Sequence, residues 1–183
     1  GRTHWRPSID TLRTLVNERT LLVLMPQVSN ILGEVWDVAA AADVAHAAGA
    51  RMMVDGVAYA PHRAPDVAAL GCDWYVYSTY KVFGPHMAAM FGTRAALDEL
   101  TGRNHSFIDA TIPYKWELGN ANHEGAAGVA AVYEYARFLS ALRGDALARG
   151  EDAPAQGKTA PGARADWSEP PRREVFERAF GVV

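Results

Sequence analysis

Two residues with complementary chemistry, Asp55 and Lys81, each stand soon after a short apolar run of the sequence. The runs cover residues 51–54 and 74–77, and turn residues with a short amphipathic stretch separate them. This alternation is typical of a strand, a crossover and a second, parallel strand, and such crossovers are almost always right-handed. Since parallel strands end on the same side of their sheet, we expect the carboxylate and the amine at one edge, where open α/β sheets bind ligands.

A carboxylate and a lysine in one crevice suit a cofactor that has a cationic ring nitrogen and a carbonyl group. Pyridoxal phosphate (PLP) is such a cofactor, since a lysine holds it as a Schiff base and an acid pairs with its pyridinium nitrogen. Both residues also have an ordinary explanation. An acid at a strand end often caps a helix, and a lysine beside Gly84-Pro85 is commonly a solvated turn residue. The spacing alone leaves both interpretations open.

The composition narrows the classes of partner. With 183 residues, 49% of them hydrophobic, the chain can form one globular domain with a substantial core. A net charge of −3 gives no electrostatic case for nucleic acid or an anionic membrane. No apolar run reaches the roughly 18 to 20 residues that cross a bilayer, and a single cysteine fits a reducing cytoplasm. We expect a cytoplasmic protein whose partners are small molecules and a second copy of itself.

The order of apolar and turn segments predicts an α/β domain of three layers, with helices on both faces of a mostly parallel sheet. A continuous apolar run at residues 20–25 is typical of a strand that is covered on both faces. Helices are expected over residues 8–19, over 37–49 with Asp37 as the N-terminal cap, from Thr93 or Arg94 to Leu100, and over 126–142. The last of these has the apolar spacing of a buried helix.

The segments VDGVAYAPH (residues 54–62) and PDVAALGCDWYVYSTYKVFGPH (65–86) resemble the core of class V, fold-type I PLP enzymes. That group contains cysteine desulfurases, selenocysteine lyases and isopenicillin-N epimerase, and the YK-FGPH variant is most similar to a cysteine desulfurase-like subfamily. The resemblance spans residues 12–142, and it implies that the strand at residues 86–92 runs antiparallel to its neighbours. Family members are considerably longer, so we expect this chain to be a partial one.

We expect three parts in the chain, the first of them from the family resemblance. Residues 1–143 correspond to the C-terminal part of the PLP-binding large domain. Residues 144–171, rich in Ala, Gly and Pro, are expected to be a linker or a disordered segment. Residues 172–183 are expected to form a short C-terminal helix.

The resemblance also implies roles for individual residues. Asp55 would contact the ring nitrogen of PLP, and Lys81 would form the Schiff base, the internal aldimine, and shuttle the Cα proton of an amino-acid substrate. Ser78 is available for the phosphate, and Tyr80 stands in an S-x-Y-K motif where other members have S-x-H-K. The reaction would be a β-elimination, a transamination or a racemisation.

Two asparagines extend this set. Asn30 lies in a segment similar to the family's SN-LG, whose asparagine is near the ring and the substrate carboxylate. Asn120 stands in the place of a threonine that, in the family, reaches the phosphate of the PLP bound by the partner subunit. An amide can still donate a hydrogen bond there. The resemblance therefore implies a homodimer.

Three further histidines have less specific explanations. His46 is expected to pack or face solvent, because no second metal ligand stands at i+4. His62 and His86 end the two quoted segments and could line the mouth of a pocket, although a structural or solvated histidine fits as well. No His, Asp and Glu set has the spacing of a metal site.

Several departures keep a second hypothesis open. Ala58 replaces the Gln or His of the family's VDGAQ or VDGVH motif, and the family's phosphate-binding loop has no counterpart here. Cys72 is expected to be a buried structural cysteine. No arginine clearly matches the substrate-carboxylate clamp, the candidates being Arg137, Arg143, Arg172 and Arg173. The alternative is a non-catalytic remnant of the fold that acts as a binding module. A nucleotide-binding domain is disfavoured, because neither G-x-G-x-x-G nor a P-loop motif occurs.

Overall fold

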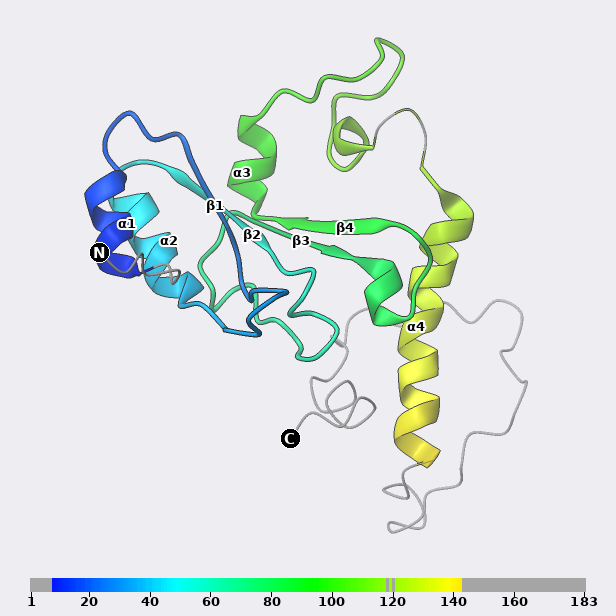
Figure 1. Cartoon of the computed structure of the whole chain (residues 1–183). Coiled ribbons are helices and arrows are strands. Elements are labelled where there is room, and N and C mark those ends of the chain that lie inside the picture. Colours follow the sequence, from blue (N-terminus) through cyan, green and yellow to red (C-terminus); the bar gives the residue numbers. More distant parts are fainter. Residues whose placement is uncertain (1–7, 118, 120, 143–183) are drawn as a thin grey trace.

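The computed structural model describes residues 8–117, 119 and 121–142 of the chain. Its centre is a four-stranded sheet in the order β1 (Leu22–Pro26), β2 (Arg51–Asp55), β3 (Trp74–Ser78) and β4 (Ala88–Gly92). The first three strands are parallel, and β4 pairs antiparallel with β3 (Figure 1). The predicted α/β class, the mostly parallel sheet and the antiparallel strand are confirmed.

The three parallel strands end at one edge of the sheet. Pro26 pairs with Asp55, the last residue of β2, and Asp55 pairs with Val76 near the end of β3. The 3₁₀ turn η1 (Thr79–Val82) follows β3 directly and carries Lys81. Asp55 and Lys81 therefore follow neighbouring parallel strands at the same edge, as the two apolar runs predict.

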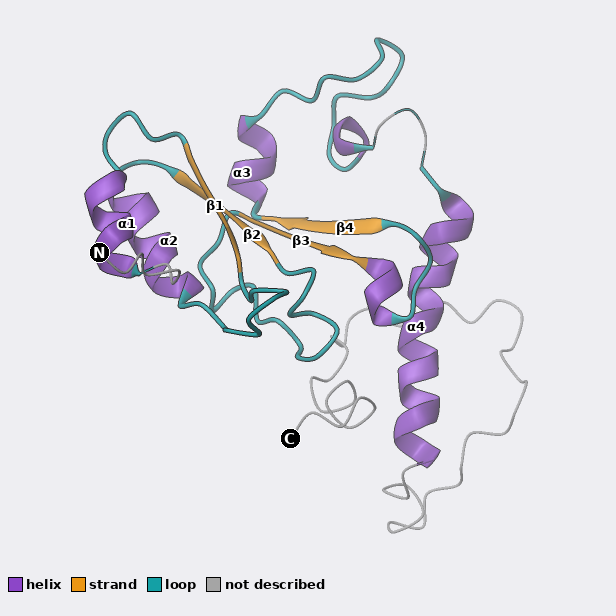
Figure 2. Ribbon diagram, in the orientation of Figure 1, coloured by secondary structure: helices purple, strands orange, loops and turns teal. Residues whose placement is uncertain are grey.

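Helix α2 (Val38–Ala47) packs against β1 and β2 and forms the core with them (Figure 2). Asp37 caps its N-terminus as predicted, since Asp37 Oδ1 accepts a hydrogen bond from the Ala40 amide at 3.0 Å. Helix α1 (Ile9–Leu15), capped by Ser8, packs on α2. Small alanine side chains let α2 approach the sheet closely. The core cluster contains Val38, Ala41, Ala42, Ala45, Ala50, Met52, Val54, Cys72 and Tyr75.

The prediction that the first strand is covered on both faces is wrong for the part of the chain that the structure describes. β1 is an edge strand of the sheet, and only its Val23 and Met25 pack against the core cluster. Leu22 and Leu24 alternate with them, so they point to the opposite face, where they are 46% and 63% exposed. A continuous apolar run does not reveal which face has a partner.

The prediction that the helix over residues 126–142 is buried is also wrong for the side chains that the structure describes. Helix α4 (His123–Leu142) exists, but of its side chains described, up to residue 139, only Gly125 and Ala136 are buried. A Cβ on Gly125 would lie 2.0 Å from Met87 Sδ, so the helix approaches the segment before β4 through a residue without a side chain. The apolar spacing of α4 therefore marks a mostly exposed helix.

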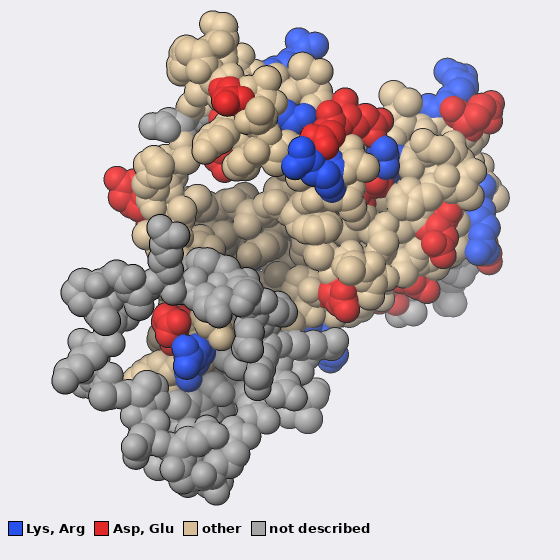
Figure 3. Space-filling view, turned by 180° about the vertical axis from the view of Figure 1, so that it is seen from behind, with Lys and Arg blue, Asp and Glu red and all other residues tan. Residues whose placement is uncertain are grey.

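Helix α3 (Arg94–Glu99) follows β4 and carries paired charges. Arg94 Nε donates to Asp98 Oδ2 at 2.7 Å, and Glu99 pairs with Arg51 of β2. Figure 3 shows acidic and basic side chains gathered next to one another on one face of the molecule, not in separate patches of one sign. Between α3 and the 3₁₀ turn η2 (Tyr114–Trp116), the chain forms an irregular loop.

The predicted linker (residues 144–171) and C-terminal helix (172–183) lie outside the described residues, so both remain predictions. Within the described part, no helix is both long enough and apolar enough to cross a membrane.

Candidate functional site

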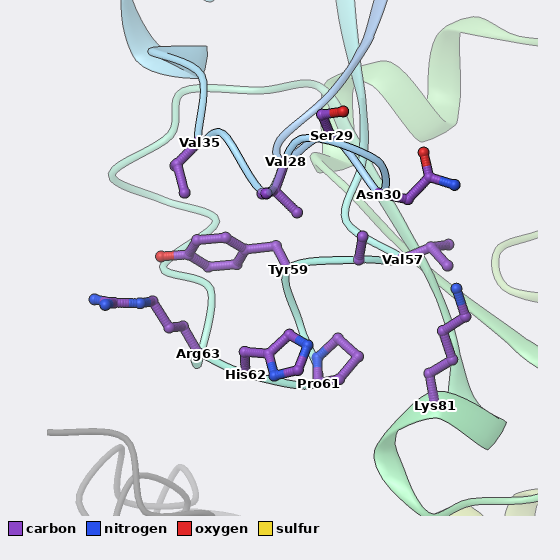
Figure 4. Close-up of a pocket in the computed structure, with 12 residues that line it drawn as sticks. Val28, Ser29, Asn30, Val35, Val57, Tyr59, Pro61, His62, Arg63 and Lys81 are labelled. Carbon is purple, nitrogen blue, oxygen red and sulfur yellow. The ribbon is translucent and has the colours of Figure 1, made fainter.

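A hollow of about 620 Å³ opens at the carboxyl edge of the parallel strands (Figure 4). Its size falls within the range of small-molecule sites. Three segments line it: residues between 28 and 35 after β1, residues between 57 and 63 after β2, and Lys81 after β3. The hollow is therefore built from the loops that leave three neighbouring strands, the place where α/β sheets bind ligands.

The turn that presents Lys81 is held by its buried neighbour Thr79. The Thr79 amide donates to Met87 O at 2.9 Å, and its hydroxyl lies within hydrogen-bond distance of the carbonyl oxygens of Pro85 and Met87. The Gly84 amide donates back to Thr79 O at 2.8 Å, and a Cβ on Gly84 would lie 2.9 Å from that oxygen. Glycine at position 84 thus lets the chain close tightly and fixes the base of the Lys81 side chain.

Asn30 is presented by the loop that leaves β1. Ser29 Oγ accepts hydrogen bonds from the two main-chain amides after Asn30, at 3.3 and 3.1 Å, and Ser29 O accepts one from the Gly33 amide at 2.8 Å. These bonds form a local turn, a usual role for serine. Figure 4 shows the Asn30 amide on the same side of the hollow as the Lys81 amine.

Asp55 lies beside the hollow but does not line it. Its Oδ1 accepts a hydrogen bond from the Val57 amide at 2.8 Å, which holds the carboxylate at the strand end. Ser78 stands at the N-cap position of η1, and no hydrogen bond from its side chain caps the turn within the described chain. Tyr80 stacks on His86, with ring centroids 5.1 Å apart.

The structure therefore brings two of the predicted site residues together in the hollow, Asn30 and Lys81. Three others, Asp55, Ser78 and Tyr80, lie at the same edge of the sheet outside the lining of the hollow. Asn120 lies outside the described residues, so its predicted contact with phosphate remains a prediction.

A buried hydrogen bond between Tyr75 and Gln27 connects two of the segments at this edge of the sheet. Tyr75, which is 1% exposed, donates through Oη to Gln27 Oε1 at 2.6 Å and so connects β3 to the loop after β1. Burial raises the pKa of Tyr75 above its ordinary value, so the phenol keeps the proton that it donates. A Cβ on Gly56 would lie 2.1 Å from the Tyr75 ring, so only glycine fits at the start of the loop after β2.

The charged side chains among the described lining residues of the hollow are both basic. Lys81 and Arg63 line it together with His62, and no carboxylate is among the described lining residues. His62 therefore lies at the hollow, whereas His86 pairs with Tyr80. Arg63 and Tyr59 were not predicted as site residues. Their position in the sequence could have indicated them, because both lie in the short series of turns that follows Asp55 at the end of β2.

The donor set fits the chemistry of PLP. Lys81 provides an amine for the carbonyl of the cofactor, and no carboxylate among the described lining residues opposes an anionic cofactor. A hollow of about 620 Å³ is large enough for a small cofactor with a bound amino acid. These residues could therefore hold PLP, with Lys81 as its covalent attachment.

A sequence profile of the aminotransferase class-V family matches residues 2–152. The chain belongs to the aminotransferase class-V family. The resemblance inferred from the motifs around Asp55 and Lys81 is therefore confirmed. Members of this family, the cysteine desulfurases among them, are PLP-dependent. The match does not favour the alternative of a non-catalytic module.

Two curated relatives illustrate the range of similarity. An aminotransferase-like protein of Gibberella zeae is 46% identical over 122 residues, which are 64% of this chain and 30% of that protein. A cysteine desulfurase of Dickeya dadantii is 36% identical over 149 residues, 74% of this chain and 35% of that enzyme. The class-V chain thus spans about a third of the length of these two relatives.

Solved structures show the same class-V fold. The cysteine desulfurase CsdA of Escherichia coli has a TM-score of 0.62 and 29% identity, over 78% of this chain and 42% of that one. A cysteine desulfurase from Thermococcus onnurineus also has a TM-score of 0.62, at 21% identity over 79% of this chain and 42% of that one, which supports the fold alone. The predicted PLP-dependent transferase fold is confirmed.

Two further features bear on the chemistry of this class-V chain. Cys72 is a free thiol and 2% exposed, which confirms the prediction that it is buried, and burial raises its pKa. A buried thiol of raised pKa is a poor nucleophile.

No group of three or more His, Cys, Asp or Glu side chains in the described part of the chain is placed to hold a metal ion.

Proposed function

We propose that this chain supplies the lysine-bearing part of a PLP-dependent enzyme that acts on an amino acid, with Lys81 as the residue that binds the cofactor covalently. One observation carries the proposal: the Lys81 amine and the Asn30 amide share a hollow at the carboxyl edge of the sheet. Membership of the class-V family and similarity to cysteine desulfurases support it.

PLP, when bound, supplies an electron sink that stabilises negative charge at the substrate Cα. The Lys81 amine, released to the hollow when substrate binds, can take a proton from Cα and return it. The Asn30 amide lies on the same side of the hollow as Lys81, so it can orient the cofactor ring and the substrate there by hydrogen bonds. The Asp55 carboxylate, held at the strand end by the Val57 amide, is proposed to accept a hydrogen bond from the ring nitrogen.

The remaining parts of the proposal depend on residues beyond the hollow. We propose a phosphate contact for Ser78, a contact with the cofactor for Tyr80, and for Asn120 a contact with the phosphate of a second copy in a homodimer. The cytoplasmic location stays a prediction. The choice among β-elimination, transamination and racemisation is likewise open to experiment, because it depends on the groups that face the substrate.

The test is to trap the cofactor on the chain and identify the lysine that carries it. The purified chain is titrated with PLP, the visible absorption is recorded, and borohydride reduction is followed by peptide mass mapping. The sequence contains three lysines, Lys81, Lys115 and Lys158, so the labelled peptide is unambiguous. We expect an absorption band and a label on Lys81.

The matched variants are Lys81→Arg and Lys115→Arg, each of which keeps the positive charge. Lys81→Arg should abolish the band and the label, because a guanidinium does not form a Schiff base under these conditions. Lys115→Arg should retain both, since Lys115 donates to the main-chain oxygens of Asp98 and Leu100, away from the hollow. No band at high PLP concentration, or a label distributed equally over the lysines, would contradict the proposal.

A further inference from the structure

The end of the hollow away from Lys81 carries an arginine to which the proposed function gives no role. Arg63 lines the hollow and is exposed. It forms no ion pair with any other residue that the structure describes. Figure 4 shows Arg63 and Lys81 on opposite sides of the hollow, with Tyr59 and His62 between them. The guanidinium is therefore available to a ligand.

The chemistry of this end favours an acidic group. Arg63 offers a planar fork of N–H donors that matches a carboxylate in two parallel hydrogen bonds. The Tyr59 hydroxyl points to the same side of the hollow as the guanidinium in Figure 4, and His62 adds a ring N–H donor. No carboxylate is among the described lining residues, so none of them would repel an anion.

The wall between the two ends is mostly apolar. Val28, Val35, Val57 and Pro61 line the hollow along the course from Lys81 to Arg63. Such side chains favour methylene groups over polar ones, because burying a polar group without a partner costs free energy. A ligand that fits this arrangement has an amino group at the Lys81 end, a short carbon chain, and an acid at the Arg63 end.

We infer that Arg63, with Tyr59 and His62, binds the side-chain acid of the substrate, so that the substrate is an acidic amino acid. This rests on the proposed function, which places the amino group of the substrate at Lys81. Arg63 is then a specificity-determining residue. The competing source of the same anion chemistry is the phosphate of the cofactor, and the experiment distinguishes the two.

The experiment compares amino acids that differ only in charge. The chain is loaded with PLP, and loading on Lys81 is measured by borohydride trapping in the wild type, in Arg63→Gln and in Arg63→Lys. Each loaded protein is then titrated with L-glutamate against L-glutamine, and with L-aspartate against L-asparagine. The change in visible absorption gives an apparent Kd without any need for turnover.

We expect the wild type to bind the acid of each pair about tenfold more tightly than the amide, the effect of one charge-assisted hydrogen-bonded contact. Arg63→Gln should remove this preference and leave cofactor loading unchanged, whereas Arg63→Lys should keep part of it. Arg94→Gln is the matched control, because it removes an equal charge from the distant helix α3. Thermal unfolding of every variant confirms that it is folded.

Three results would overturn the inference. Equal affinity of the wild type for the acidic amino acid and its amide would overturn the inference about Arg63. It would leave the proposed function intact, since the label on Lys81 would still form. Reduced PLP loading in Arg63→Gln with an unchanged preference would assign Arg63 to the phosphate. Failure of the wild type to load at all would overturn the proposed function and this inference together.

Discussion

The buried Asp73 carboxylate joins Arg51 across the sheet, with Nη1 of Arg51 2.8 Å from Oδ1 of Asp73. The second oxygen of Asp73 accepts from His46 Nε2 and from the Met52 amide, both at 2.8 Å. His46 therefore does more than pack or face solvent, because it ties helix α2 to the start of β3. One carboxylate thus connects α2, β2 and β3 at the amino end of the parallel strands.

Asp73→Asn should destabilise the fold by about 2 to 3 kcal/mol, because a neutral amide loses the charge-assisted hydrogen bonds to Arg51 and His46. The free energy of unfolding is measured by urea titration. Asp43→Asn, on the exposed face of α2, is the control and should change it by less than about 0.5 kcal/mol. Equal stability of the two variants would show that the Asp73 contacts add nothing to the fold.

The same carboxylate should make the stability depend on pH in the acid range. Burial opposes ionisation of Asp73, but the hydrogen bonds from His46, the Met52 amide and Arg51 outweigh it and lower the pKa. A carboxyl whose pKa is lower in the folded state stabilises the fold above its unfolded pKa of about 3.9, and this contribution disappears as the pH falls through the folded value. Unfolding measured from pH 6 downward should show a steeper loss below about pH 4 in the wild type than in Asp73→Asn. Parallel curves would contradict this linkage.

Gly56→Ala should destabilise the protein by about 1 to 3 kcal/mol through overpacking, because the new Cβ would meet the Tyr75 ring. Thermal or urea unfolding gives the value. The double variant Gly56→Ala with Tyr75→Ala tests the cause, since removal of the ring should make the two effects non-additive. Simple additivity would mean that the Tyr75 ring is not what excludes a side chain at position 56.

Cys72 should resist thiol reagents in the folded protein, because it is buried and burial raises the pKa of its thiol. Alkylation by iodoacetamide, followed by mass spectrometry, should be slow in buffer and complete in denaturing urea. Because Cys72 is the one cysteine of the chain, a single added mass reports it. Rapid alkylation without denaturant would instead indicate an accessible thiol able to accept sulfur.

The sequence by itself predicted the strands along the chain and the edge of the sheet at which Asp55 and Lys81 lie. The runs at residues 51–54 and 74–77 each end one residue before their strand ends, so Asp55 and Lys81 could be placed at one edge from periodicity and chain direction alone. Local signals were equally readable: Asp37 begins α2 because its side chain is short and lies next to the first free amides. The antiparallel strand after Gly84-Pro85 came from the family resemblance, and the sheet confirms it.

Only the tertiary structure decided which side chains meet. Asp73 lies 22 residues from Arg51 and 27 from His46, and no local pattern records a contact between segments so far apart. Periodicity could not show that Leu22 and Leu24 face outward, because an apolar run looks the same whether one or both faces are covered. Arg63 and Lys81 share a hollow because loops from neighbouring strands converge, and convergence depends on how the strands are ordered in space, a property of the packed chain.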